Sequence, residues 1–119
     1  MKMTLPEQGC LLRVFLGESD RHNGKPLYEW LVLQAREQGL AGATVLHGIE
    51  GFGARSRLHT AKILRLSEDL PIVLEIVDTR EKIDAFLPTV DRTVGEGLVT
   101  LEDVTVRFYR AGAGSGGGR

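Results

Sequence analysis

The sequence is poor in cysteine. Its 119 residues contain only Cys10, so no disulfide can form within the chain. No stretch approaches the roughly 20 apolar residues of a membrane-spanning helix, and the first residues lack the apolar core of a signal peptide. Positive charge is not in excess either: 15 basic residues face 16 acidic ones, for a net charge of −1. This balance argues against nucleic-acid binding, which needs a basic surface. We therefore expect a cytoplasmic protein in which any basic site is local.

Recognisable catalytic and cofactor motifs are also absent. The sequence has no Walker A sequence, no nucleophile elbow and no Rossmann fingerprint. The histidines His22, His47 and His59 lack the spacing of zinc ligands, with one another or with the cysteine. Glu18 and Asp20 are close enough to hold a cation, but acidic loops of this kind are usually solvated. We therefore expect no metal site, and an enzyme is the weaker hypothesis.

The length fits a single domain. We place this domain at residues 1–110, because the remaining residues, 111–119, are almost entirely glycine, alanine and serine. Such a composition cannot bury apolar surface, so it predicts a disordered tail.

Hydrophobic periodicity predicts six secondary-structure elements in the domain. The predicted strands are residues 10–17, 42–51, 71–77 and 98–110, and the predicted helices are residues 26–38 and 79–94. The order strand, helix, strand, strand, helix, strand is the split βαβ pattern of a ferredoxin-like α+β sandwich. We expect a four-stranded antiparallel sheet with two helices on one face.

Details of these elements can be predicted as well. Asp78 and Glu81 have the spacing of a capping box at the start of the second helix. Pro88 lies inside that helix and should kink or break it. In the last strand, Phe108 continues an apolar alternation and is expected to face the core.

The sheet face away from the helices is also predicted to be apolar. Leu11, Phe15 and Val73 fall on that face by strand alternation. An apolar sheet face that no helix covers usually packs against a partner. This predicts a homo-oligomer whose subunits pack sheet to sheet.

Glycines and arginines occur together after the second predicted strand, in "HGIEGFGARSR" at residues 47–57. Glycine backbone can present successive N–H groups to an anion, and Arg55 can add charge-assisted hydrogen bonds to a phosphate. A flexible hairpin loop with solvated charges is the alternative, because a Gly-x-Gly pattern is weak as a motif.

A second glycine cluster, "TVGEGLVT" at residues 93–100, precedes the last strand. In the ferredoxin-like order the two glycine loops need not touch within one subunit. They can meet across a subunit boundary, where Arg107 would join them in one cleft.

Three segments carry a family resemblance: "GATVLHGIEGFGARSRLH", "LPIVLEIVD" and "VGEGLVTLEDVTV". They resemble the PII-like bacterial and archaeal family called domain of unknown function 190, over residues 11–108. A more distant similarity is to the PII signal-transduction proteins, whose second strand ends in Gly-Phe-Gly-Arg. Here Gly51, Phe52 and Gly53 match, but Ala54 stands at the arginine position. Leu98 stands where PII proteins use a lysine.

The resemblance implies a homotrimer with its sheets facing inward and an effector bound in the clefts between neighbours. The effector would be an adenine nucleotide, AMP, ADP or ATP, and binding would change the order of the loop at residues 52–66. Val45 and Val99 would sandwich the base. Some family members are linked to a fluoride-exporting channel, which suggests a membrane channel protein as a partner. The candidate nucleotide-binding residues are Gly51, Phe52, Gly53, Arg55, Gly95, Gly97, Val99 and Arg107.

Two other functions stay open at this point. One is an interaction module that binds a membrane channel partner and no ligand. The other is a small ferredoxin-like enzyme that acts on an anionic metabolite. Thermal shift with a panel of nucleotides separates them, because an interaction module shows no shift and an enzyme also shows turnover.

Overall fold

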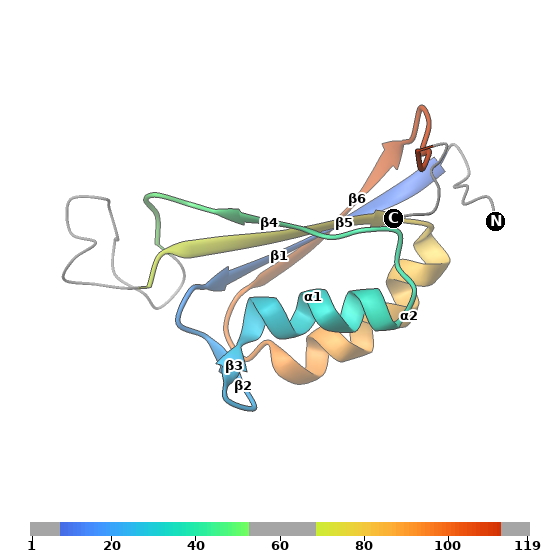
Figure 1. The fold of residues 1–119 in the computed structure, drawn as a ribbon. Coiled ribbons are helices and arrows are strands. Elements are labelled where there is room, and N and C mark those ends of the chain that lie inside the picture. Colours follow the sequence, from blue (N-terminus) through green and yellow to red (C-terminus); the bar gives the residue numbers. More distant parts are fainter. Residues whose placement is uncertain (1–7, 53–68, 113–119) are drawn as a thin grey trace.

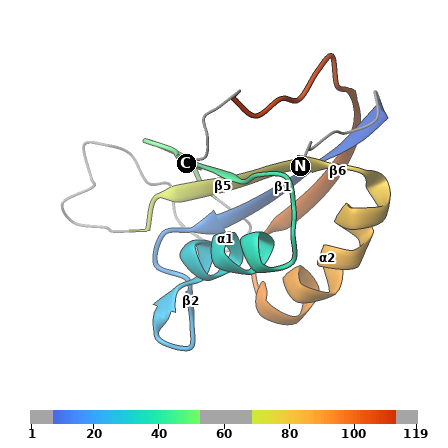
Figure 2. The ribbon, with the colours of Figure 1, turned by 45° about the vertical axis from the view of Figure 1, so that its right-hand side comes forward.

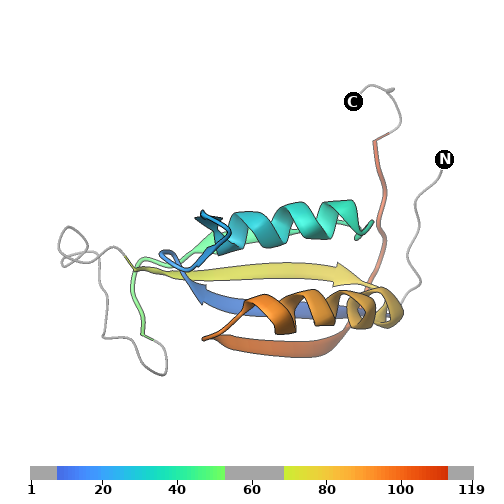
Figure 3. The ribbon, with the colours of Figure 1, turned by 90° about the horizontal axis from the view of Figure 1, so that it is seen from below.

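A computed structural model describes residues 8–52 and 69–112 of the chain. One four-stranded antiparallel sheet, in the order β4-β5-β1-β6, forms a layer, and two helices lie together on one of its faces (Figure 1; Figure 3). This arrangement confirms the predicted ferredoxin-like α+β sandwich. The sheet consists of β1 (Gln8–Gly17), β4 (Thr44–His47), β5 (Pro71–Asp78) and β6 (Leu98–Thr105), and the helices are α1 (Leu27–Glu37) and α2 (Arg80–Thr93).

The hydrophobic core lies between the sheet and the helices. Alternation along β1 directs Leu12, Val14 and Leu16 toward the helices, and all three are buried. Leu31 of α1 and Phe86 of α2 meet them and are fully buried. At about 25 cal/mol per Å² of apolar surface, each such side chain stabilises the fold by roughly 1.5–3 kcal/mol. These residues alternate with Leu11 and Phe15, which the sequence places on the opposite face of the strand.

The start of α2 differs from the capping pair predicted at Asp78. Thr79 is the N-cap, and its hydroxyl accepts a hydrogen bond from the backbone N–H of Lys82 at 3.1 Å. Asp78 instead ends β5, where its side chain turns into the protein and is almost fully buried. Pro88 lies inside α2 and does not end it, because the helix continues to Thr93.

A short hairpin separates β1 from α1. It consists of β2 (Arg21–His22) and β3 (Lys25–Pro26). Asn23 and Gly24 join the strands with φ of 52° and 79°, as a two-residue type I′ turn requires. The ring of His22 packs on Trp30 of α1 with centroids 4.2 Å apart.

The chain leaves the sheet earlier than predicted at its C-terminal side. β6 ends at Thr105, opposite Gln8, and residues 106–112 continue as an irregular segment that we call the C-terminal strap (Figure 2). Phe108 lies in this strap and is 61% exposed, so its predicted place in the core is wrong. Its ring is covered by the guanidinium of Arg110, 4.0 Å from the ring centroid.

Two predictions lie outside the described residues. The loop expected to change its order falls mostly within residues 53–68, and most of the predicted tail falls within residues 113–119. Among the described residues, no helix is long and apolar enough to cross a membrane.

Candidate functional site

The two glycine loops lie at the same end of the sheet but at opposite edges. Gly51 follows β4, and Gly97 precedes β6. The strands β5 and β1 separate these two edge strands. As expected from the strand order, the loops lie apart within one subunit, because three strand spacings, roughly 14 Å, separate the two edge strands.

The glycines of these loops differ in what surrounds them. A Cβ atom at Gly97 would collide with the backbone carbonyl oxygen of Phe15, whereas a Cβ at Gly95 would meet no atom within 4 Å. Gly48 and Gly51 lie against the ring of Pro71, whose Cγ would be 2.8 Å and 3.2 Å from the added Cβ atoms. Packing within the fold is therefore sufficient to explain the glycine at position 97, but it does not explain Gly95.

Three other predicted residues are exposed. Phe52 lies beside Gly51 after β4, and Val99 lies on β6 opposite Val14. Arg107 is in the C-terminal strap, at the far end of the sheet from Gly97. The eight residues of β6 rise about 3.3 Å each, so roughly 23 Å separates the ends of this strand. Gly53 and Arg55 lie outside the described residues.

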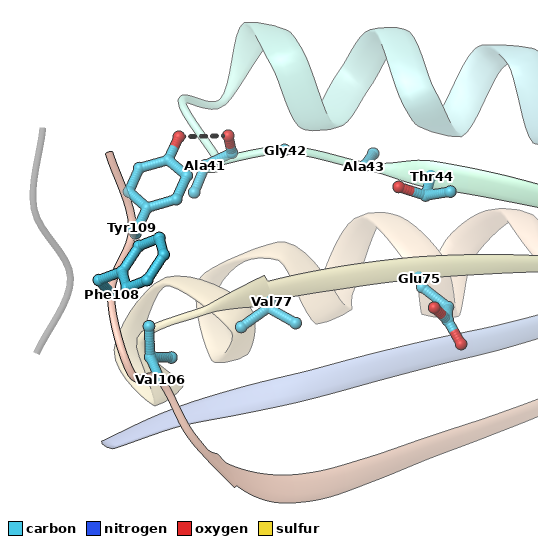
Figure 4. A pocket seen from close by; sticks show the side chains of 9 residues that line it. All are labelled: Ala41, Gly42, Ala43, Thr44, Glu75, Val77, Val106, Phe108 and Tyr109. Carbon is cyan, nitrogen blue, oxygen red and sulfur yellow. Dashed lines mark hydrogen bonds between the residues drawn. The ribbon is translucent and has the colours of Figure 1, made fainter. Parts of the chain in front are cut away.

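A cavity of about 350 Å³ opens at the strap end of the sheet, on the face away from the helices (Figure 4). This volume is at the lower end of the range for small-molecule sites. One wall is the connection from α1 into β4, the floor is β5, and the other wall is the strap. The residues that line it are Ala41, Gly42, Ala43, Thr44, Glu75, Val77, Val106, Phe108 and Tyr109.

Two polar side chains of the cavity, Glu75 and Thr44, can accept hydrogen bonds from a ligand. Glu75 lies in its floor and is paired through Oε2 with Nε of Arg13 at 2.9 Å; Arg13 also contacts Glu102 through Nη1 at 3.1 Å. The hydrogen bond to Glu75 raises the pKa of Arg13. Thr44 stands opposite Glu75 on the neighbouring strand. None of the described residues that line the cavity is basic, so the cavity suits a neutral, partly apolar group with N–H donors better than a phosphate.

The sequence did not predict this cavity, although one residue pointed to a polar site on β5. Glu75 is the only charged residue in the otherwise apolar run 71–77. Val45, expected to sandwich a base, packs partly buried against the core on the helix side of the sheet. Its neighbour Thr44 faces the cavity instead (Figure 4).

An apolar row crosses the open face of the sheet beside the cavity. Antiparallel pairing places Leu46 opposite Val73, Val73 opposite Phe15, and Phe15 opposite Leu98. Leu46 and Leu98, at the two edges, are 48% and 56% exposed. A continuous row of this kind is typical of an interface.

Other reactive groups in the described part of the chain form no further site. His47 Nε2 lies 3.3 Å from Glu18 Oε1, but no group of three or more histidine, cysteine, aspartate or glutamate residues there could hold a metal ion. Burial raises the pKa of the Cys10 thiol, which keeps it protonated and unreactive.

Comparison with known proteins shows the family. The family model of domain of unknown function 190, described as Uncharacterized ACR, matches residues 9–106, and the chain belongs to this family. A UPF0166 protein of Aquifex aeolicus (strain VF5) is 44% identical over 98 residues, covering 82% of this chain and 92% of the relative. A UPF0166 protein of Methanocaldococcus jannaschii is 34% identical over 97 residues, covering 81% and 89%.

Solved structures show the same PII-like fold. CPII from Thiomonas intermedia K12, bound to ADP and bicarbonate, matches with a TM-score of 0.59 at 18% identity, over 83% of this chain and 88% of that one. CPII bound to ADP, AMP and bicarbonate, described as a nitrogen regulatory PII-like protein, matches with a TM-score of 0.60 at 17% identity, over the same shares of the two chains. The class of this protein is therefore PII-like in fold, as its sequence resemblance predicted.

Proposed function

We propose that this protein is a PII-like regulatory protein that binds an adenine nucleotide in the clefts between the subunits of a homotrimer. The observation that carries the proposal is the division of the candidate site between two ends of one sheet. The cavity and Arg107 lie at the strap end, and the glycine loops lie at the other end.

A cyclic trimer brings such separated halves together. In a ring each interface is heterologous, so one surface of a subunit meets a different surface of its neighbour. The apolar row on the open sheet face provides contact area near the centre of the ring. The strap end of one subunit can then face the glycine end of the next.

The chemistry of the two halves indicates where the base and the phosphates of the nucleotide bind. The base enters the cavity, where Glu75 and Thr44 accept hydrogen bonds from donors such as an exocyclic amine. The phosphates extend from the cavity toward the neighbour's backbone N–H groups at Gly51, Gly53 and Gly97, with Phe52, Gly95 and Val99 beside them. Arg55 and Arg107 neutralise the phosphate charge. In this assignment the cavity residues, and not Val45, contact the base, because Val45 packs on the core.

The comparisons support a nucleotide ligand. CPII shares this fold and was solved with ADP and AMP bound. The described residues offer positioned hydrogen-bond acceptors and backbone donors rather than a nucleophile with its base, so we propose a binding protein without catalytic activity.

Regulation follows from the position of the loop after β4. Phosphate contacts at Gly51 and Gly53 would order residues 52–66, and the ordered loop would be read by a partner such as a membrane channel. Order–disorder transitions driven by phosphate are a common switching device.

Calorimetric titration with AMP, ADP and ATP tests the proposal. The wild type should bind at least one of them, and Thr44→Trp, which fills the cavity, and Gly53→Val should each abolish binding. Arg55→Ala and Arg107→Ala should each weaken binding by about 1.5–3 kcal/mol, the range for hydrogen bonds to charged groups. Arg36→Ala is the matched control, because Arg36 is exposed on α1, away from both halves. Absence of binding of all three nucleotides to the wild type contradicts the proposal and favours the ligand-free interaction module.

A further inference from the structure

Ala41 is held through both of its backbone polar groups. Its N–H donates to Oδ2 of Asp78 at 2.8 Å, and its carbonyl oxygen accepts from the hydroxyl of Tyr109 at 2.8 Å (Figure 4). Ala41 belongs to the connection between α1 and β4, Asp78 ends β5, and Tyr109 lies in the C-terminal strap. Three segments far apart in the sequence therefore meet at the backbone of one residue.

The hydrogen bond from Ala41 to Asp78 is rigidly held. Asp78 is 1% exposed, and its second oxygen accepts from the backbone N–H of Thr79 at 2.7 Å. A buried carboxylate with both oxygens hydrogen-bonded to backbone is expensive to move, because each lost bond would leave a buried polar group without a partner. Ala41 is therefore fixed relative to β5 and α2.

The Tyr109 side is the weaker one. The strap has left the sheet after Thr105 and has no strand ladder to hold it. Val106 packs over Gly9, where an added Cβ atom would lie 3.0 Å from Val106 Cγ2. Farther along, the hydroxyl of Tyr109 attaches the strap to the opposite edge of the sheet. Between these two points the strap forms one wall of the cavity.

We propose that Tyr109 is a positioning residue for the cavity, and that its hydroxyl couples ligand binding to attachment of the C-terminal strap. This inference rests on the proposed function and concerns how binding is regulated. The strap changes its order when the site is filled, in addition to the loop after β4. A ligand that contacts the attached strap shifts the strap toward its attached state. Attachment of the strap then raises the affinity for the ligand by the same factor, because the coupling is reciprocal.

Tyr109→Phe tests this coupling, because it removes the hydroxyl and keeps the ring. Binding of AMP should weaken about 3- to 10-fold, the effect of one neutral hydrogen bond, while the thermal midpoint stays close to that of the wild type. Tyr28→Phe is the matched control: Tyr28 is the other tyrosine, on α1 and away from the cavity. It should leave the affinity for AMP unchanged.

Hydrogen exchange of the strap amides, measured with and without AMP, distinguishes this coupling from a purely structural role of Tyr109. In the wild type AMP should slow exchange across residues 106–112. In Tyr109→Phe exchange should be faster without ligand, and AMP should protect the strap less. Equal AMP affinity in Tyr109→Phe and wild type, or strap exchange that does not respond to AMP in the wild type, overturns the inference while the proposed function stands. If the wild type binds no AMP, ADP or ATP, the proposed function fails and this inference fails with it.

Discussion

Gly95 and Gly97 lie two residues apart but have different surroundings. At Gly97 the fold itself needs the space, because the backbone of Phe15 occupies the place of a Cβ atom. At Gly95 the surroundings are open, so only a ligand or a neighbouring subunit would exclude a side chain. The sequence alone predicted one role for both, because glycine gives the same signal for close packing and for an anion-binding backbone.

This difference predicts that alanine destabilises the protein at position 97 but not at position 95. Gly97→Ala should lower the free energy of unfolding by about 1–3 kcal/mol, the usual cost of forcing an extra methyl group into a packed site. Gly95→Ala should change it by less than about 0.5 kcal/mol, as surface substitutions usually do. Urea unfolding at a fixed protein concentration measures both. Equal stability of the two variants would show that Gly97 is not constrained by Phe15.

At the scale of elements, strands with apolar alternation were predicted best. β1 and β5 differ from prediction by two residues or fewer at each end, because both pair along most of their length in the middle of the sheet. β4 and β6 are shorter than predicted. They are edge strands, where an apolar alternation can continue after the pairing ends, as it does through Val106 and Phe108. The cap of α2 was misplaced by one residue, since Asp78 and Thr79 are both good N-cap residues and tertiary contacts decide between them.

The position of this cap has a measurable consequence. Thr79→Ala should lower the free energy of unfolding by about 1 kcal/mol, because it removes the acceptor for the backbone N–H of Lys82. Thr79→Ser keeps that acceptor and should retain most of the stability. Thermal unfolding followed by circular dichroism compares the three proteins. A stable alanine variant would mean that the capping bond contributes nothing.

At the scale of the whole molecule, the order of elements and the family resemblance predicted the fold, whereas the cavity was not predicted. Its walls come from the connection after α1, the middle of β5 and the strap, and no spacing along the chain brings these segments together. The same separation explains why the candidate residues do not form one site within a chain: the glycine loops and Arg107 lie at opposite ends of the sheet.

We propose that each binding site is shared between neighbouring subunits. Complementation in mixed trimers tests this sharing. Thr44→Trp blocks the cavity half, and Gly53→Val blocks the glycine half. Each variant alone should form a trimer by light scattering and bind no nucleotide. When the two chains are co-expressed and assemble at random, about a quarter of the clefts combine two intact halves. If the site is shared, calorimetry should recover nucleotide binding at about that fraction of sites, with the affinity of the wild type. Mixed trimers that bind no nucleotide, although both parent variants are folded and trimeric, would contradict a shared site.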